Sequence, residues 1–286
     1  MIDATLRGVI PLEVTMHDNA RPEGMRRVFG FPDFIPTVEA EYPRFFEVGP
    51  RVLSAMHSVS DRDYPAPEPH QRAILNLSML AAISLVEVVT LTVNGLGHGA
   101  MRIVRSLMET AINVEYFRLQ PEAFEDYREW VHVERFRKID FMRQHIPVVF
   151  ATIEPEVIAA IEREMERVRP RFERRDGSMR QSWSAQNLAE RAAVAGFSET
   201  YKAINPLASS FVHETMSALM EHFKAANDPH RVEVPPTLDW SRQALTGAHD
   251  CIVRVVKTLS ETFGVAPEPT VETLVKELHY AWTEAR

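Results

Sequence analysis

The feature that most constrains this fold is the most apolar stretch of the chain, which runs from Gln71 to Asn94. Its segment 73–93 is long enough to cross a bilayer. Glu87 lies near the centre of that segment, however, and a charged side chain is costly to bury in lipid. We therefore expect a core helix of a cytoplasmic protein with no membrane association, around which the other helices pack.

A second helix is predicted over residues 100–117, after a turn at Gly95–Gly97 whose glycines suit a helix C-cap. At 3.6 residues per turn, one side of this helix is polar and the other is apolar. Charged groups beside an apolar face are costly unless they are paired. Glu87 of the preceding helix is therefore a natural partner for either Arg102 or Arg105 of the polar stripe. The stripe consists of Arg102, Arg105, Glu109 and Asn113.

The rest of the chain also has helical rather than alternating periodicity, which predicts an all-α fold of roughly seven to nine helices in a single antiparallel bundle. Residues 1–35 are rich in proline and glycine and are expected to form an irregular N-terminal arm, with one helical domain over 36–286. Asn205 with Pro206, Thr237 and Thr270 are the expected helix starts in the C-terminal half. The other expected helices span about 36–58, 122–145, 154–167 and 184–195.

Composition narrows the classes of function. The net charge of −8 argues against binding of nucleic acid or anionic membrane over the whole surface, but it does not exclude a local basic patch. The single Cys251 excludes an intramolecular disulfide and a multi-cysteine zinc site. The first residues lack the basic and apolar regions of a signal peptide, which fits a cytoplasmic protein.

The strongest candidate site joins the polar stripe to the predicted helix that follows Asn205. Ser209, His213 and Ser217 are spaced at i, i+4 and i+8, close to one face, and this face is expected to lie against the stripe. A histidine near a carboxylate can serve as general acid or base, and an arginine can hold a phosphate. The expected catalytic residues are Arg105, Glu109, Ser210 and His213, and the expected ligand-binding residues are Glu87, Arg102, Asn113 and Ser209. The alternative is a structural polar cluster that fixes how two helices pack.

Two other stretches of the sequence have residues that could carry chemistry. Glu129 and His132 form an E-x-x-H pair, but a di-iron bundle needs a second copy and two further carboxylate helices. No metal and no cofactor are therefore expected, and nucleophile-elbow, P-loop and dinucleotide fingerprints are absent from the sequence. Residues 163–180 carry seven arginines and four acids; a solvated mobile loop is expected there, with a phosphate or nucleic-acid contact as the alternative.

Several short motifs follow one another in a fixed order over residues 70–225. These motifs are R-S-L-x-E (105–109), Tyr116-Phe117, S-W-S (182–184), Ala189-Glu190, Gly196, Tyr201 and S-S-x-x-H (209–213). In the order of these motifs the chain resembles a bacterial family, the domain of unknown function 5677. The resemblance implies an α-helical domain related to the HEPN (higher eukaryote and prokaryote nucleotide-binding) superfamily, many of whose members are ribonucleases or toxin partners in bacterial stress and phage defence.

One departure from the superfamily bears on catalysis. HEPN ribonucleases carry an arginine four to six residues before the histidine, and residues 205–212 contain none. Arg105 could supply it from another helix. The expected function is thus handling of a phosphate-bearing ligand, nucleotide or RNA, with the question of catalysis open. The alternatives are a non-catalytic interaction module and, less favoured, a metal-dependent enzyme. The C-terminal helices over 238–284 either complete the core or form the face of an expected homodimer.

Overall fold

The computed structural model describes residues 31–213 and 236–284. Within these ranges the chain is all-α, as predicted, with an isolated bridge between Glu173 and Met179 as its only β pairing. The α-helices number eleven in this part of the chain, more than expected. They are α2 (Ile35–Glu41), α3 (Pro43–Ser60), α4 (Pro69–Val93), α5 (Gly97–Leu119), α6 (Ala123–His145), α7 (Pro147–Phe150), α8 (Pro155–Phe172), α9 (Leu188–Val194), α10 (Ser198–Val212), α12 (Ser241–Phe263) and α13 (Val271–Glu284).

The extra helices arise at prolines. The predicted first helix is divided where Pro43 starts α3, and Pro147 ends α6 but begins the short α7. Proline removes a backbone donor and fixes φ, so it both interrupts one helix and suits the first turn of the next. Most of the predicted N-terminal arm lies outside the described residues.

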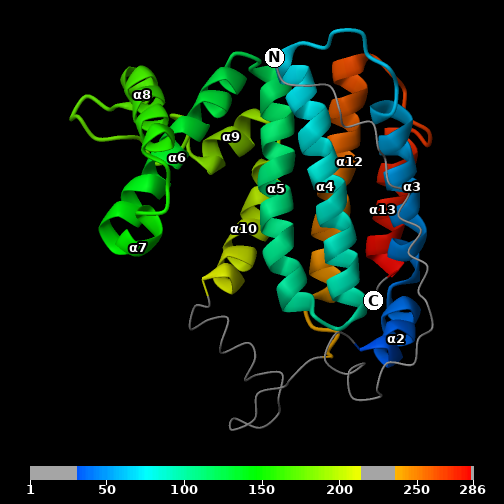
Figure 1. Cartoon of the computed structure of the whole chain (residues 1–286). Helices are drawn as coiled ribbons and strands as arrows, with labels where there is room; N and C mark the ends of the chain where they lie inside the picture. The colour runs from blue at the N-terminus through cyan, green and yellow to red at the C-terminus, as the bar shows by residue number, and fades with distance from the viewer. Residues whose placement is uncertain (1–30, 214–235, 285–286) are drawn as a thin grey trace, which may run out of the picture.

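The body of the molecule is a bundle of long helices in which α4, α5 and α12 pack on one another, with α3 and α13 beside α12 (Figure 1). Its core consists of apolar side chains that α4, α5 and α12 turn toward each other. Among them are Ile74, Leu85, Leu107, Met108, Ile112, Phe117, Ile252 and Val256. The last two show that the C-terminal helices complete the core, which was one of the two predicted roles for them.

Helices α6, α7 and α8 lie to one side of this bundle, and α9 and α10 pack against α5 (Figure 1). The long helix predicted over 122–145 is confirmed as α6. Two predicted starts are wrong. Helix α10 begins at Ser198, so Asn205 and Pro206 lie inside it, and α12 begins at Ser241 rather than after Thr237. Here Gly196 at φ +70° and Trp240 at φ 63° turn the chain, and the cap residues alone did not reveal that.

The turn between α4 and α5 is fixed by glycine, as predicted. Gly95 has φ +69°, the left-handed conformation that ends many helices. Gly97 is required for another reason: a Cβ there would lie 2.0 Å from the carbonyl oxygen of Asp239. Thr237 N also donates a hydrogen bond to Gly95 O (3.2 Å). The turn therefore packs against the segment that leads into α12.

Helix α4 is central but only half covered. Its inner side carries Ile74, Leu85 and Val88, which are buried, whereas Leu80 and Ile83 are 55% and 54% exposed. It is also the one helix in the described ranges long and apolar enough to cross a membrane, with a mean hydropathy of 2.0, a test that the core helix of a soluble protein also passes. Glu87 is exposed, so it needs no buried cation, and its predicted pairing with the arginines of α5 is wrong.

Candidate functional site

The candidate site is built on the polar stripe of α5, which consists of Arg102, Arg105, Glu109 and Asn113. These residues recur at helical spacing, and the side of α5 that carries them lies against α9 and α10. The predicted contact with the helix of Ser209 is confirmed by two hydrogen bonds. Arg105 Nε donates to Ser209 Oγ (3.0 Å), and Arg102 Nε donates to the carbonyl oxygen of Phe211 (2.8 Å). Ser217 lies outside the described residues.

Ser209 links the stripe to a chain of hydrogen bonds along α10. Its hydroxyl lies 3.4 Å from Asn205 Oδ1, and Asn205 Nδ2 lies 3.2 Å from the hydroxyl of Tyr201. These residues are spaced at four positions on one helix face. The sequence suggested Asn205 as a helix cap. Its side chain instead accepts a hydrogen bond from Ser209, the serine whose hydroxyl accepts one from Arg105.

The other two residues expected on this helix behave differently. Ser210 turns its hydroxyl to the carbonyl oxygen of Leu207 in its own helix (2.7 Å). His213 is exposed at the C-cap of α10, where its backbone N–H donates to Ser209 O (3.0 Å). The structure thus places Arg102, Arg105 and Ser209 together, with His213 one turn beyond Ser209. Their functional roles stay predictions.

Glu109 has a charged partner that the sequence did not indicate. Arg191 of α9 places its Nη2 3.6 Å from Glu109 Oε1, and its side chain is only 3% exposed. The guanidinium also lies 4.6 Å from the ring centre of Trp183, and Nη1 donates to Gln186 O (3.3 Å). Burial lowers the pKa of Arg191, while the negative charge of Glu109 opposes that shift. A faint signal was present, because Arg191 directly follows the Ala189-Glu190 motif.

Trp183, which lies over this buried arginine, belongs to a group of aromatic rings. The ring of Trp183 lies 5.4 Å from that of Tyr127 and 6.0 Å from that of Tyr116, measured between centroids. Tyr116 donates its hydroxyl proton to Gln186 Oε1 (3.0 Å), and burial raises the pKa of that hydroxyl. A guanidinium over an indole gains electrostatic attraction from the ring face. Glu109 of the stripe thus adjoins a buried cation that lies over an aromatic ring.

Two buried polar atoms of this region lack partners. Arg191 Nε and Asn113 Oδ1 have no hydrogen bond within the described ranges, and both residues are at least nine-tenths buried. Asn113 lies one turn from Glu109 on α5. An unmet buried polar group costs about 1–3 kcal/mol. Asn113 of the stripe and Arg191 beside it are thus buried at some cost to stability, which is common at binding sites.

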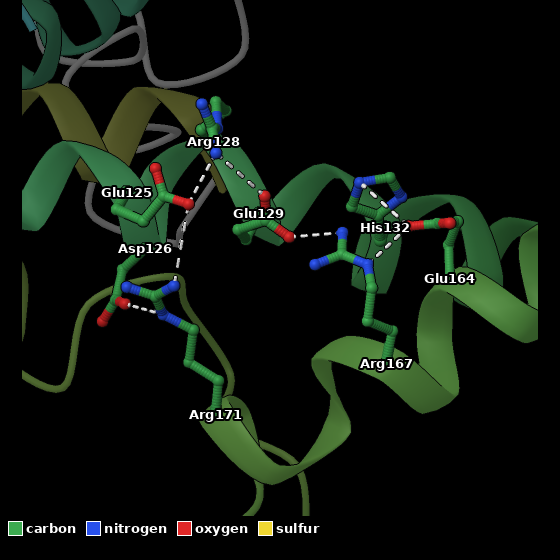
Figure 2. Close-up of polar contacts among 8 residues, drawn as sticks. All are labelled: Glu125, Asp126, Arg128, Glu129, His132, Glu164, Arg167 and Arg171. Atoms are coloured by element: carbon green, nitrogen blue, oxygen red, sulfur yellow. Dashed lines mark hydrogen bonds and ion pairs between the residues drawn. The ribbon is translucent and has the colours of Figure 1, made fainter. Parts of the chain in front are cut away.

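The E-x-x-H pair of α6 belongs to a network of charges with α8, drawn in Figure 2. Glu129 Oε2 accepts a hydrogen bond from Arg167 Nη2 (2.5 Å), and His132 Nε2 lies 3.9 Å from Glu164 (Figure 2). Burial of Glu129 opposes its ionisation, but the hydrogen bond and charge of Arg167 outweigh it, so the pKa of this carboxyl is lowered. In the part of the chain that the structure describes, no group of three or more metal-ligating side chains comes together.

The arginine-rich segment 163–180 is not the mobile loop that was expected. Residues up to Phe172 belong to α8, and the chain then turns through Gly177 and pairs Glu173 with Met179. Four of its seven arginines are matched with acids on α6 and α8, so the expected partial cancellation of charge is confirmed; Figure 2 shows the pairs of Arg167 and Arg171. The matched pairs are Arg167 with Glu129 and Glu164, Arg169 with Glu166, Arg171 with Asp126 and Glu125, and Arg180 with Asp126.

Comparison with models of protein families gives a match. A family model described as a family of unknown function (DUF5677) matches residues 72–230. This span begins in α4 and includes the whole α5 stripe, Arg191 and the described part of α10. Searches of curated proteins and of solved structures find no match.

Proposed function

The chain belongs to the family of unknown function DUF5677, and we propose on that premise that its α5 stripe binds a phosphate-bearing ligand, either a nucleotide or RNA. Two arginines, Arg102 and Arg105, lie one turn apart at the end of the stripe nearest His213. Arginine suits phosphate because its planar guanidinium can donate two parallel hydrogen bonds to the oxygens. The proposed ligand would lie along α5 and α10, over these two side chains.

The observation that carries the proposal is the hydrogen bond from Arg105 Nε to Ser209 Oγ. Ser209 is four residues before His213, within the interval of four to six residues at which a HEPN ribonuclease has its arginine. Arg105 therefore lies, on α5, beside the part of α10 in which a HEPN ribonuclease would carry its arginine and this chain carries none. This supports the HEPN-like interpretation, and with it a role in bacterial stress or defence.

The geometry favours binding over cleavage. Nε of Arg105 is used by Ser209, and its two terminal nitrogens make no hydrogen bond to the described residues, so they are available for a phosphate. By contrast, Ser210 is engaged with its own helix, and Glu109 is paired with Arg191 rather than with His213. A histidine without an aligned carboxylate or serine is a weak acid-base catalyst. We therefore propose a binding protein whose ribonuclease activity is absent or slight.

The test is a thermal-shift and calorimetric screen of the full chain with inorganic phosphate, mononucleotides and a short single-stranded RNA, at low and physiological salt. A ligand that binds the folded state raises the melting temperature, and the rise for a phosphate ligand weakens with salt. Arg105→Ala should abolish the shift without lowering the melting temperature of the free protein greatly. Arg175→Ala, an equal loss of charge in the exposed turn after α8, is the matched control.

Three outcomes would overturn the proposal. One is the absence of any shift with all three probes. Another is a shift that Arg175→Ala abolishes and Arg105→Ala leaves unchanged, which would move the site to the arginine-rich segment. The last is strong destabilisation by Arg105→Ala with no ligand found, which would make the cluster structural and favour the alternative of an interaction module. The exposed apolar side of α4 is the observation that supports that alternative.

A further inference from the structure

The outer side of α4 presents a continuous exposed stripe that no described residue covers. Its apolar members are Met79, Leu80, Ile83 and Val86, with exposures between 40% and 55%. The spacing of three and four residues places them in one row. Polar residues lie at both ends of the same row. The α4 stripe consists of Arg72, Asn76, Met79, Leu80, Ile83, Val86, Glu87 and Thr90, all exposed.

The α4 stripe is complementary to itself when reversed. If two copies of α4 run antiparallel about an axis between positions 79 and 80, residue i of one copy lies at the same height as residue 159 − i of the other. Met79 then lies opposite Leu80, and Asn76 lies opposite Ile83. Arg72 lies at the height of Glu87 of the second copy, and this pairing occurs twice because of the symmetry. The four charges of a two-fold pair are thus matched by sign.

We propose that the α4 stripe is the docking surface for a second copy of this chain, with the two α4 helices antiparallel. This inference goes beyond the proposed function and uses none of its residues. The α4 stripe also differs from the dimer face that the sequence suggests, which lies on α12 and α13. Much of that apolar surface is already used, because Ile252, Val255 and Leu274 are buried within the chain.

The surroundings of α4 fit such a pairing. A groove of about 190 Å³ lies between α3 and α4 and is lined by Phe46, Pro50 and Val86. Another groove, of about 500 Å³, lies between α4 and α6 at the opposite end of the stripe, beside Arg72 and Tyr127. Helices pack by placing the side-chain ridge of one into the groove of another. In the antiparallel pair, the Val86 end of one ridge lies over the Arg72 end of its partner.

A second copy suits this surface better than a lipid bilayer does. Arg72 and Asn76 border the apolar row at one end and Glu87 borders it at the other, so a bilayer that covered the row would dehydrate these polar groups without giving them partners. A second copy instead offers an opposite charge to each of the two charged residues. An apolar centre with a charged rim is the usual anatomy of a protein interface.

The first test is the oligomeric state of the full chain by analytical ultracentrifugation at tens of micromolar. We expect a dimer. Ile83→Glu should give a monomer with an unchanged circular dichroism spectrum, since Ile83 is more than half exposed. Arg72→Glu and Glu87→Arg should each raise the dissociation constant by about tenfold, the equivalent of 1.4 kcal/mol, and the double swap should restore it. Val275→Glu, an equally exposed apolar position on α13, is the matched control and should leave the dimer intact.

The second test locates the axis by cross-linking. The native Cys251 is buried and should not react with an oxidant. A cysteine introduced on the surface is therefore the accessible thiol among the described residues. Met79→Cys and Leu80→Cys should form an intermolecular disulfide on oxidation, whereas Val275→Cys should not. A monomeric parent chain would refute the proposal. So would a dimer that dissociates with Val275→Glu but not with Ile83→Glu, charge swaps that do not compensate one another, or binding to zwitterionic vesicles that Ile83→Glu abolishes.

Discussion

Glu109 on α5 and Arg191 on α9 form an ion pair, 3.6 Å from Oε1 to Nη2, in which the carboxylate side chain is 40% exposed and the guanidinium side chain only 3%. The buried cation therefore depends on a carboxylate that solvent can reach. Because the described residues leave Arg191 Nε without a partner, the arginine is not fully satisfied even when this pair is made. The pair joins the predicted site residue Glu109 to a residue that sequence reasoning missed.

Replacing Glu109 should test whether this pair serves stability or a ligand. If the pair is structural, Glu109→Gln should lower the free energy of unfolding by about 1–2 kcal/mol. The substitution removes the counter-charge of a buried guanidinium, and solvent can replace that charge only in part. Urea unfolding measures this. Glu199→Gln, whose pair with Lys202 is highly exposed, should change stability by less than about 0.5 kcal/mol. A neutral or stabilising Glu109→Gln would contradict the structural role and indicate a pair held for binding.

The turn between α4 and α5 offers a comparison of two glycines. Gly97→Ala should destabilise the chain by about 3 kcal/mol, because its Cβ would meet the carbonyl oxygen of Asp239 at 2.0 Å and force the segment before α12 to move. Gly99→Ala should be neutral or stabilise by up to about 1 kcal/mol, since its Cβ would meet Leu91 at an ordinary 3.7 Å and alanine favours helix. Equal melting temperatures for the two variants would show that the contact with Asp239 is not rigid.

Stability should fall below neutral pH because of His249. This residue is wholly buried beside Phe45, its Nδ1 lies 2.7 Å from Leu245 O, and burial lowers the pKa of its imidazole from 6.5. With the folded pKa below the unfolded one, the unfolded chain binds the extra proton first. The contribution of neutral His249 to the free energy of unfolding is therefore constant above the unfolded pKa, and it is lost as the pH falls from about 7 toward 5.

Replacing His249 should flatten that pH dependence. His249→Gln should remove up to one proton from the difference between the unfolded and folded states over this window, as measured by urea unfolding at a series of pH values. The matched control, His279→Gln on exposed α13, should leave the slope unchanged. An identical slope in the parent chain and in His249→Gln would show that the imidazole is already protonated, or titrates normally, in the folded protein.

The contact between α6 and α8 should also depend on pH, at a more acidic range. Glu129→Gln should cost about 1 kcal/mol near neutral pH, because the pair with Arg167 is lost but that arginine is half exposed. The folded pKa of Glu129 is lowered, so its contribution is present above the unfolded pKa of about 4.3 and is lost as the pH falls through the folded value. The cost of Glu129→Gln should therefore vanish in acid, whereas a cost that persists there would indicate packing rather than charge.

Local patterns in the sequence determined a large part of the fold. The period of 3.6 residues identified α4, α5 and α6 as helices and placed Arg102, Arg105, Glu109 and Asn113 on one side of α5. Prolines and Gly95 marked where helices end. The contact of this stripe with Ser209 was also predictable, because a polar row on an apolar helix requires polar partners and the S-S-x-x-H segment offered a matching row.

Only the tertiary structure determined which side chains and which helices contact one another. Glu87 was expected inside because α4 is apolar on nearly every side, yet no described helix covers its outer face. Arg191 is buried over Trp183 because α9 docks against α5, and the periodicity of a short helix does not say which neighbour it meets. Periodicity depends on the bonded geometry of a few adjacent residues. Pairing depends on which faces remain once all helices compete for one core, so it is a property of the whole chain.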